Sequence, residues 1–266
     1  MESLEAYTDF ASVYDVFMDG TPYQGWADFL AEMIEKYGIS KPVRDGQEKN
    51  LVLELGCGTG ALTERMYEKG YDMIGVDNSQ EMLGVALAKK EASGSDILYL
   101  CQDMRELDLY STVGTVISAC DSINYLLEGQ EVEGVFALVE NYLYPGGLFL
   151  FDFNTLYKYE QVIGDATIAE NREECSFIWE NYFHGKERVN EYDLTVFVKE
   201  GKGNMFRRFT ETHFQRGYTL EEMEGFLERA GMEVLFALDA DTHQAPGAQS
   251  QRIYLAAREQ RKKNGG

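Results

Sequence analysis

The first 40 residues of the chain carry apolar side chains at helical spacing. The apolar positions of the first segment recur every three or four residues and therefore share one helix face. They are Tyr7, Phe10, Tyr14, Phe17 and Met18. A second such pattern covers residues 23–37 and stops at Gly38, which we expect to close the helix in the left-handed conformation. Two amphipathic helices are predicted ahead of the main fold.

From residue 51 onward, short apolar runs alternate with amphipathic segments. The runs are the length of buried strands, and the segments between them have the period of helices. This alternation predicts an open, parallel sheet with helices on both of its faces. The predicted strands are residues 51–55, 71–76, 97–101, 113–119 and 148–153, and the predicted helices are residues 61–69, 79–90 and 130–143.

The pattern changes again after Asn154, where apolar and polar residues alternate in the manner of antiparallel strands. The expected strands are residues 173–183, 189–200 and 204–216. A helix over 219–230 then resumes the α/β pattern, with Thr219 as its N-cap and Glu222 as the capping-box partner. Two further strands are expected near residues 233–238 and 252–257. We therefore expect an α/β domain of residues 1–154 plus 217–260, with residues 1–40 as a helical cap, and a β-rich insertion over 155–216.

Composition places the chain among ordinary globular proteins, because 44% of its 266 residues are hydrophobic and 26% are charged. Its formal net charge of −22 repels polyphosphates and anionic lipids at long range. This argues against DNA as a partner and against a membrane surface. No stretch approaches the roughly 18 apolar residues of a membrane-spanning helix.

The four cysteines stand at positions 57, 101, 120 and 175, and no two of them form a C-x-x-C pair. That spacing is not typical of a metal site, so we expect no metal. Reduced thiols in a cytoplasmic protein are the simplest interpretation.

A glycine-rich loop follows the first strand of the predicted sheet. The sequence L-E-L-G-C-G-T-G at 53–60 ends that strand and opens a helix, where only glycine lets the backbone turn sharply and approach a ligand. Asp77 stands 21 residues beyond Gly56, at the end of the second strand. A carboxylate there can accept hydrogen bonds from both ribose hydroxyls, so the two features together predict a site for a nucleoside cofactor.

These residues alone do not identify the cofactor. Gly56, Gly58 and Ala61 also satisfy the G-x-G-x-x-G/A pattern of dinucleotide-binding folds, so an enzyme that uses a nicotinamide cofactor stays open. A glycine turn without any ligand is the third interpretation.

Further motifs resemble those of the class I S-adenosylmethionine-dependent methyltransferases. E-L-G-C-G-T-G is followed by G-V-D-N-S at 75–79, by Q-D-M-R at 102–105 and by C-D-S-I-N-Y-L at 120–126. The chain is most similar to a bacterial group of unassigned substrate and to small-molecule N-methyltransferases. The resemblance implies a Rossmann-like sheet of seven strands, the last antiparallel, with an antiparallel β insertion after the fifth strand.

The resemblance also implies which residues bind S-adenosylmethionine. In such enzymes the acid after the second strand, here Asp77, binds ribose, and Asp103 with Met104 lies against adenine. The implied cofactor residues are Tyr14, Trp26, Glu54, Gly56, Cys57, Gly58, Gly60, Asp77, Asn78, Met82, Asp103, Met104, Cys120, Asp121 and Tyr125. The product would be S-adenosylhomocysteine.

Methyl transfer from a sulfonium is an in-line displacement that needs alignment and no covalent nucleophile. A general base helps where the acceptor arrives protonated. The candidates for catalysis are Tyr14, Tyr125 and His213. The alternatives are that Tyr14 and Trp26 are core aromatics, that Tyr125 belongs to a capped loop, and that His213 forms an exposed pair with Glu211.

Taken together, these patterns favour methyl transfer to nitrogen or oxygen of a small cytosolic metabolite, by a monomer or homodimer. An NAD(P)-dependent oxidoreductase is one alternative. A non-catalytic protein that binds S-adenosylmethionine or docks on a partner is another. A protein or RNA acceptor also stays open.

Overall fold

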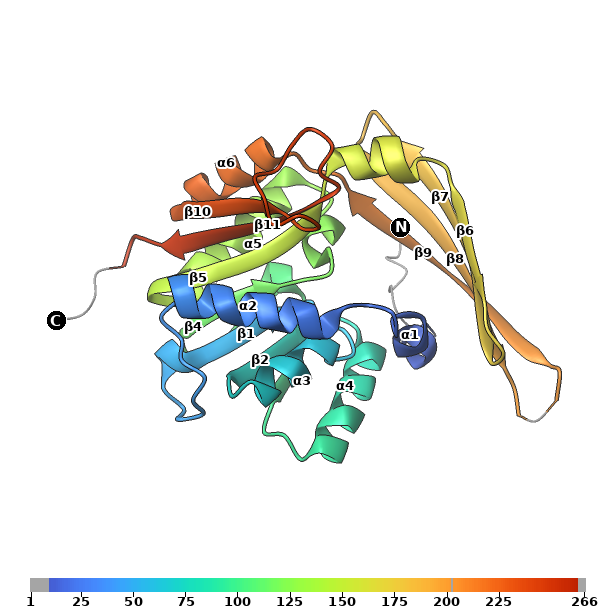
Figure 1. Ribbon diagram of the computed structural model, residues 1–266, viewed down its shortest axis with the longest axis horizontal. Helices are drawn as coiled ribbons and strands as arrows, with labels where there is room; N and C mark the ends of the chain where they lie inside the picture. Colours follow the sequence, from blue (N-terminus) through green and yellow to red (C-terminus); the bar gives the residue numbers. More distant parts are fainter. Residues whose placement is uncertain (1–9, 202, 263–266) are drawn as a thin grey trace.

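The computed structural model describes residues 10–201 and 203–262, and its main body is built on a seven-stranded sheet (Figure 1). The strand order is β10-β11-β5-β4-β1-β2-β3. Strand β11 runs antiparallel to both of its neighbours, whereas β5, β4, β1, β2 and β3 are parallel. The strands are β1 (Leu51–Leu55), β2 (Asp72–Asp77), β3 (Leu98–Cys101), β4 (Val113–Ser118), β5 (Leu143–Asn154), β10 (Met232–Asp239) and β11 (Arg252–Glu259). The expected fold class, with the last strand antiparallel, is confirmed.

Helices cover both faces of this sheet. The apolar sides of α2 (Tyr23–Tyr37) and α3 (Ala61–Glu68) pack on one face, and those of α5 (Gly129–Tyr142) and α6 (Leu220–Ala230) pack on the other. Helix α4 (Gln80–Ser93) lies beside β2 and β3. Fully buried side chains such as Phe136 and Met66 contribute about 1.5–3 kcal/mol each to folding. The sheet is therefore a rigid platform for the loops at its carboxyl edge.

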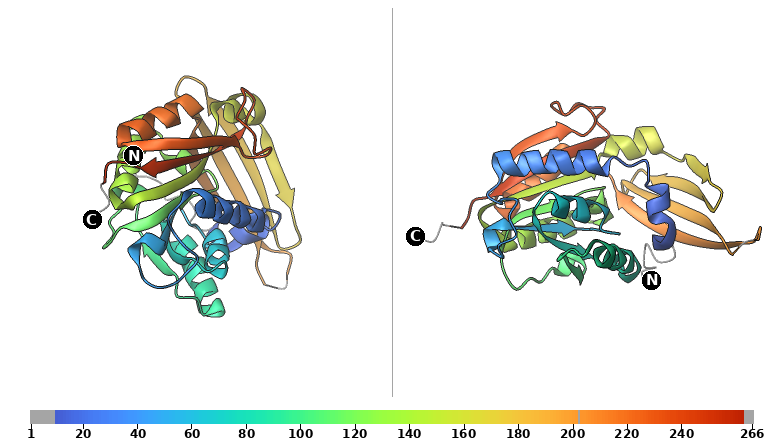
Figure 2. Two further views of the ribbon diagram at one scale, coloured as in Figure 1. Left: turned by 60° about the vertical axis from the view of Figure 1, so that its left-hand side comes forward. Right: turned by 60° about the horizontal axis from the view of Figure 1, so that its bottom comes forward.

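A second, antiparallel sheet projects from the body (Figures 1 and 2). Its order is β6-β7-β8-β9, with bounds Thr167–Asn171, Cys175–His184, Val189–Lys199 and Phe206–Arg216. The last three strands match the sequence prediction. Strand β6, which follows a π-helix over Lys158–Ile163, was not predicted. Its five residues are almost all exposed, so they lack the apolar alternation that marks a strand.

Helix α1 (Ala11–Phe17) bridges the body and the second sheet. On one side its residues join an apolar cluster with β7 and β8, made of Phe10, Val13, Cys175, Tyr192, Leu194 and Val196. On the other side the Asp15 carboxylate accepts a hydrogen bond of 2.6 Å from the Thr59 hydroxyl in the glycine loop. The same carboxylate pairs with Lys89 of α4 at 2.6 Å. The predicted position of Tyr7 lies outside the described residues.

Two details of the helix ends test the sequence reasoning. The capping box of α6 is confirmed, since Thr219 and Glu222 each accept the other's backbone amide. The left-handed conformation expected at Gly38 is wrong, because its φ of −92° and ψ of 174° are extended. Glycine is needed there for space: a Cβ would lie 2.8 Å from the Ile34 carbonyl oxygen.

Within residues 10–201 and 203–262, every helix is too short or too polar to cross a bilayer. The four cysteines are free thiols. Over the same residues, no three histidine, cysteine or acidic side chains converge to hold a metal ion.

Candidate active site

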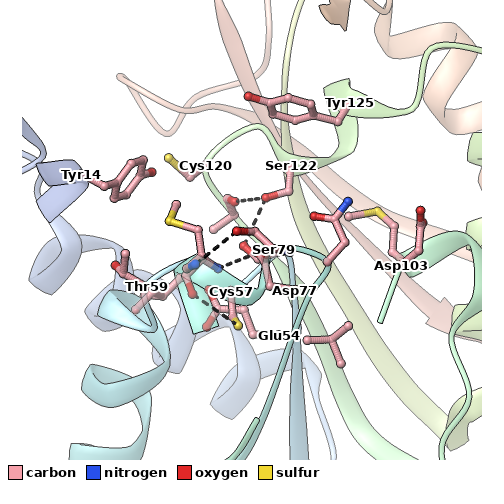
Figure 3. A pocket seen from close by; sticks show the side chains of 18 of the residues that line it. Tyr14, Glu54, Cys57, Thr59, Asp77, Ser79, Asp103, Cys120, Ser122 and Tyr125 are labelled. Atoms are coloured by element: carbon pink, nitrogen blue, oxygen red, sulfur yellow. Dashed lines mark hydrogen bonds between the residues drawn. The ribbon is translucent and has the colours of Figure 1, made fainter. Parts of the chain in front are cut away.

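A cavity of about 520 Å³ lies at the carboxyl ends of β1, β2 and β4, the edge where open α/β sheets bind ligands (Figure 3). Its volume is in the range of small-molecule sites. Helices α1 and α2 contribute Tyr14 and Trp26 to its wall, and strand β9 contributes three consecutive residues, Thr212, His213 and Phe214. Both sheets therefore shape one cavity, and all but two of the predicted cofactor residues line it.

The glycine loop approaches the cavity closely because its backbone is left-handed. Gly56 has φ +70°, and a Cβ there would lie 2.4 Å from the Ser122 hydroxyl oxygen. The amides of Gly56 and Cys57 donate to the Val76 carbonyl at 2.8 and 3.0 Å, which ties the loop to the neighbouring strand β2. Any side chain at position 56 would displace Ser122 or distort this turn.

Asp77 is held between the loop and the start of α4. Its Oδ2 accepts the Gly58 amide at 2.8 Å, and its Oδ1 accepts the Ser79 amide at 2.9 Å. Burial raises the pKa of this carboxyl, and the same backbone hydrogen bonds oppose the rise. Each carboxylate oxygen keeps a second lone pair for a further donor such as a hydroxyl.

Asp103 lies on the other side of Asp77 from Tyr14 (Figure 3). Its carboxylate pairs with Arg105 at 2.6 Å, and Arg105 also pairs with Glu131 at 2.9 Å. Partial burial raises the pKa of Asp103, but the hydrogen bonds and the charge of Arg105 outweigh it and the net pKa is lowered. Asp103 therefore offers an ionised acceptor beside the Met104 side chain.

Glu54, at the end of β1, is a buried carboxyl in the cavity wall. Burial raises its pKa to about 8, although the Thr63 hydroxyl donates to it at 2.5 Å and lowers the value. Near neutral pH this group is mostly protonated, so it can donate a hydrogen bond as well as accept one.

Gly60 and Asp121 are the two predicted cofactor residues that do not line the cavity. Gly60 begins α3 at φ +72°, and a Cβ there would lie 2.4 Å from the Tyr99 hydroxyl, so it serves the packing of the loop. The side chain of Asp121 contacts strand β9. Its carboxylate accepts from the Gln215 amide at 2.6 Å, and its own backbone amide donates to Asp152 at 2.8 Å.

Tyr14, Trp26 and Cys120 stand in the wall of the same cavity. The Trp26 ring stacks on the Arg252 guanidinium, 4.4 Å from the ring centroid. Burial and the charge of Asp121 raise the pKa of the Cys120 thiol to about 12, against the opposing influence of Arg252 and Tyr14. The thiol is therefore protonated and is a poor nucleophile, as a direct methyl transfer allows.

Tyr125 and His213 come together at the wall of the cavity, one from a short 3-10 helix over Ser122–Tyr125 and the other from β9. The Tyr125 hydroxyl lies 3.2 Å from His213 Nδ1 and 2.7 Å from the Tyr192 hydroxyl. The alternative of an exposed pair with Glu211 is half right: the pair is present, with 3.3 Å between His213 Nε2 and Glu211 Oε2, but His213 is only 1% exposed. A phenol in the cavity wall with an imidazole behind it can relay a proton.

Sequence reasoning missed several lining residues. Arg105 follows two positions after Asp103 in the same motif, and Ser79 is the last residue of G-V-D-N-S and caps α4, so both carried a usable signal. Thr212 and Phe214 carried none, because only the folding of β9 against the body brings them to the cavity. The missed residues include Tyr23, Thr59, Ser79, Gln102, Arg105, Ser122, Leu126, Thr212 and Phe214.

The fold and this cavity define an α/β protein of the nucleoside-binding type, and comparison with known proteins narrows it. Residues 52–147 match a family described as a methyltransferase domain. A methyltransferase-family protein of Geobacillus sp. (strain WCH70) is 36% identical over 252 residues, covering 95% of this chain and 99% of its own length. The chain belongs to the S-adenosylmethionine-dependent methyltransferases.

Two further similarities extend this assignment. A solved S-adenosylmethionine-dependent methyltransferase from Clostridium acetobutylicum ATCC 824 is 29% identical with a TM-score of 0.81, covering 96% of this chain and 99% of that one. The dTDP-3-amino-3,4,6-trideoxy-alpha-D-glucopyranose N,N-dimethyltransferase of Streptomyces venezuelae is 25% identical over 231 residues, 85% of this chain and 91% of its own length. The family assignment favours methyl transfer over the nicotinamide-dependent alternative.

Proposed function

We propose that this enzyme transfers a methyl group from S-adenosylmethionine to the amine nitrogen of a small metabolite. The observation that carries the proposal is the Tyr125 phenol at the cavity wall with His213 hydrogen-bonded behind it. Most aliphatic amines are protonated near neutral pH, as lysine is, and must lose a proton before nitrogen can attack carbon. A base at the cavity wall meets that need.

The described residues fit the donor. Asp77 would accept the ribose hydroxyls, Asp103 and Met104 would face adenine, and the close backbone at Gly56 and Gly58 leaves room for the amino-acid tail. When bound, S-adenosylmethionine supplies an electrophilic methyl group on a sulfonium. The chain itself then has to align the acceptor, exclude water and remove one proton.

The proton has a continuous path through this chain's own side chains. The acceptor's N–H proton passes to the Tyr125 oxygen while the Tyr125 O–H proton passes to His213 Nδ1. Nitrogen then uses its freed electron pair to form the new bond to carbon, and the carbon–sulfur bond breaks with its electrons left on sulfur. The Tyr192 hydroxyl, 2.7 Å from that of Tyr125, holds the phenol in place.

Charge favours a cationic acceptor. The chain's net charge of −22 steers cations toward it, and the cavity wall carries the acidic residues Asp77, Glu81 and Asp103 against the single cation Arg105 among its described strongly basic side chains. The S. venezuelae relative, by its name, acts on an amino sugar. Both points support nitrogen over oxygen as the methylated atom.

We further propose a division of labour between two parts of the chain. Residues 1–154 with 217–260 would hold the donor, and the insertion over 155–216 would select the acceptor. The support is that Thr212, His213 and Phe214 of β9 enter the wall of a cavity otherwise built by the main body.

The experiment uses methyl-labelled S-adenosylmethionine and a cell extract separated by size. Each fraction is tested before and after N-selective acetylation, which blocks amines and leaves hydroxyl groups free. We expect label to enter the small-molecule fraction and to be lost after acetylation. Label confined to protein or RNA, or label that survives acetylation, would overturn the proposal.

A further inference from the structure

We infer that Glu211 is a positioning residue for this reaction, which orients His213 so that its Nδ1 can take the proton of Tyr125. The inference rests on the proposed function, since it concerns the same proton path. The carboxylate of Glu211 does not itself line the cavity and lies behind the imidazole of His213.

Glu211 and His213 stand two residues apart on β9, so their side chains share one face of the strand. Glu211 Oε2 lies 3.3 Å from His213 Nε2. The exposed fractions are 8% for Glu211 and 1% for His213, so water does not screen the pair. A buried carboxylate is costly unless an opposite charge compensates it, and an imidazolium at this distance supplies that charge.

The contacts at the two ring nitrogens select a tautomer. A phenol 3.2 Å from Nδ1 donates best to an unprotonated nitrogen, and the negative charge of a carboxylate 3.3 Å from Nε2, an ion-pair contact outside hydrogen-bond geometry, favours a proton on that nitrogen. His213 therefore carries its proton on Nε2 and presents a lone pair to Tyr125. When Nδ1 takes the second proton, the carboxylate of Glu211 stabilises the resulting imidazolium.

The other oxygen of Glu211 connects this arrangement to α1. Glu211 Oε1 accepts the backbone amide of Phe10 at 3.0 Å, directly before the helix that brings Tyr14 to the cavity. The carboxylate of Glu211 thus contacts both the imidazole of His213 and the residue directly before α1. Its orientation is set from two sides, as a positioning group requires.

The groups packed around His213 come from three elements. Tyr125 approaches from the 3-10 helix, the ring of Tyr192 on β8 stacks at 4.8 Å, and Glu211 of β9 is the charged group among these contacts. A second carboxylate–imidazole pair, Glu191 of β8 with His184 of β7 at 2.7 Å, lies at the surface of the same antiparallel sheet. It offers a matched control outside the cavity.

The first test needs no acceptor. Nitrogen-15 spectra of the imidazoles, recorded on the full chain with S-adenosylhomocysteine, report the tautomer of each of the three histidines. We expect His213 in the Nε2–H form, and a mixture of both forms in Glu211→Leu, with Glu191→Leu leaving the His213 signals unchanged. The Nδ1–H form in the wild-type protein would overturn the inference.

The second test uses the acceptor found by amine labelling. Glu211→Gln should lower kcat by about 10-fold or more with little change in KM, and should move the acidic limb of the kcat/KM profile to lower pH. Glu191→Gln should leave both unchanged. Calorimetry with S-adenosylhomocysteine confirms that each variant is folded.

The two proposals can fail separately. An unshifted acidic limb in Glu211→Gln, with amine methylation intact, contradicts the role of Glu211 alone. Absence of amine methylation in the wild-type protein, with the Nε2–H form observed, contradicts the proposed acceptor and leaves the positioning of His213 supported.

Discussion

Asp77 accepts the backbone amide of Gly58 at 2.8 Å, so the acid at the end of one strand fixes the loop at the end of its neighbour. This contact joins the two features that a nucleoside needs: a close backbone and a carboxylate for ribose. Since Asp77 also holds the Ser79 amide, it organises the cavity before any ligand arrives.

Replacing Asp77 should therefore weaken donor binding. We expect Asp77→Ala to raise the Kd for S-adenosylmethionine about tenfold or more, because charge-assisted hydrogen bonds of about 1.5–3 kcal/mol each are lost. Isothermal calorimetry measures this directly. Asp72→Ala, at the opposite end of the same strand, is the control and should bind normally. An unchanged Kd for Asp77→Ala would place the ribose elsewhere.

The buried carboxyl of Glu54 should make stability depend on pH. Its pKa in the folded protein is about 8, above the ordinary 4.5. Its contribution to the free energy of unfolding is therefore fully present below pH 4.5 and is lost as the pH rises through 8. The loss is on the order of 5 kcal/mol. Glu54→Gln should remove that loss and so gain stability relative to wild type between pH 5 and pH 9.

Urea unfolding at pH 5 and pH 9 provides the comparison for Glu54. The exposed Glu68→Gln on α3 serves as the control and should follow the wild-type curve. If the free energies of unfolding of Glu54→Gln and wild type differ by the same amount at pH 5 and pH 9, Glu54 is ionised in the folded protein.

The contact of Asp15 with Thr59 and Lys89 should slow release of the donor. Asp15→Asn removes the charge of the carboxylate that accepts from Thr59 in the glycine loop and pairs with Lys89 of α4. Partly exposed pairs of this kind contribute about 0.2–1 kcal/mol, so we expect a few-fold faster dissociation, measured by stopped-flow displacement.

The control for Asp15→Asn is Asp28→Asn on α2, which weakens a comparable surface pair with Lys69 at the end of α3 and should leave the rate unchanged. Equal effects of both substitutions would mean that α1 has no special part in retaining the donor.

Tyr125 and His213 should act as one unit in turnover. We expect Tyr125→Phe and His213→Gln each to lower kcat by about 10²-fold, within the usual range for a general base. The double variant should be little worse than either single one, because one proton path is interrupted in all three.

Steady-state kinetics with the acceptor identified by labelling checks this, and the exposed Tyr182→Phe should match wild type. Multiplicative losses in the double variant would show that the two side chains act independently.

Most of the fold and the donor side of the cavity could be predicted from local sequence patterns. The glycine loop and Asp77 were predictable because their chemistry is set by residues adjacent to strand ends. The acceptor side was less predictable, since Glu211 meets Phe10 across 201 positions of sequence and β9 reaches the cavity only after the second sheet has packed.

Two predicted cofactor residues lie outside the cavity wall for the same physical reason. Gly60 and Asp121 have the residue types of ligand-binding positions, but packing turns them toward Tyr99 and Gln215. Spacing specifies that a turn occurs, and the neighbours that contact its side chains decide which residues face the ligand.

Calorimetric titration of the purified full chain with S-adenosylmethionine and with NADH tests the donor site most directly. We expect S-adenosylmethionine to bind with a Kd on the order of micromolar and NADH to give no heat of binding, because the carboxylate and glycine loop hold one nucleoside beside a sulfonium. Binding of NADH with no binding of S-adenosylmethionine would contradict the assignment.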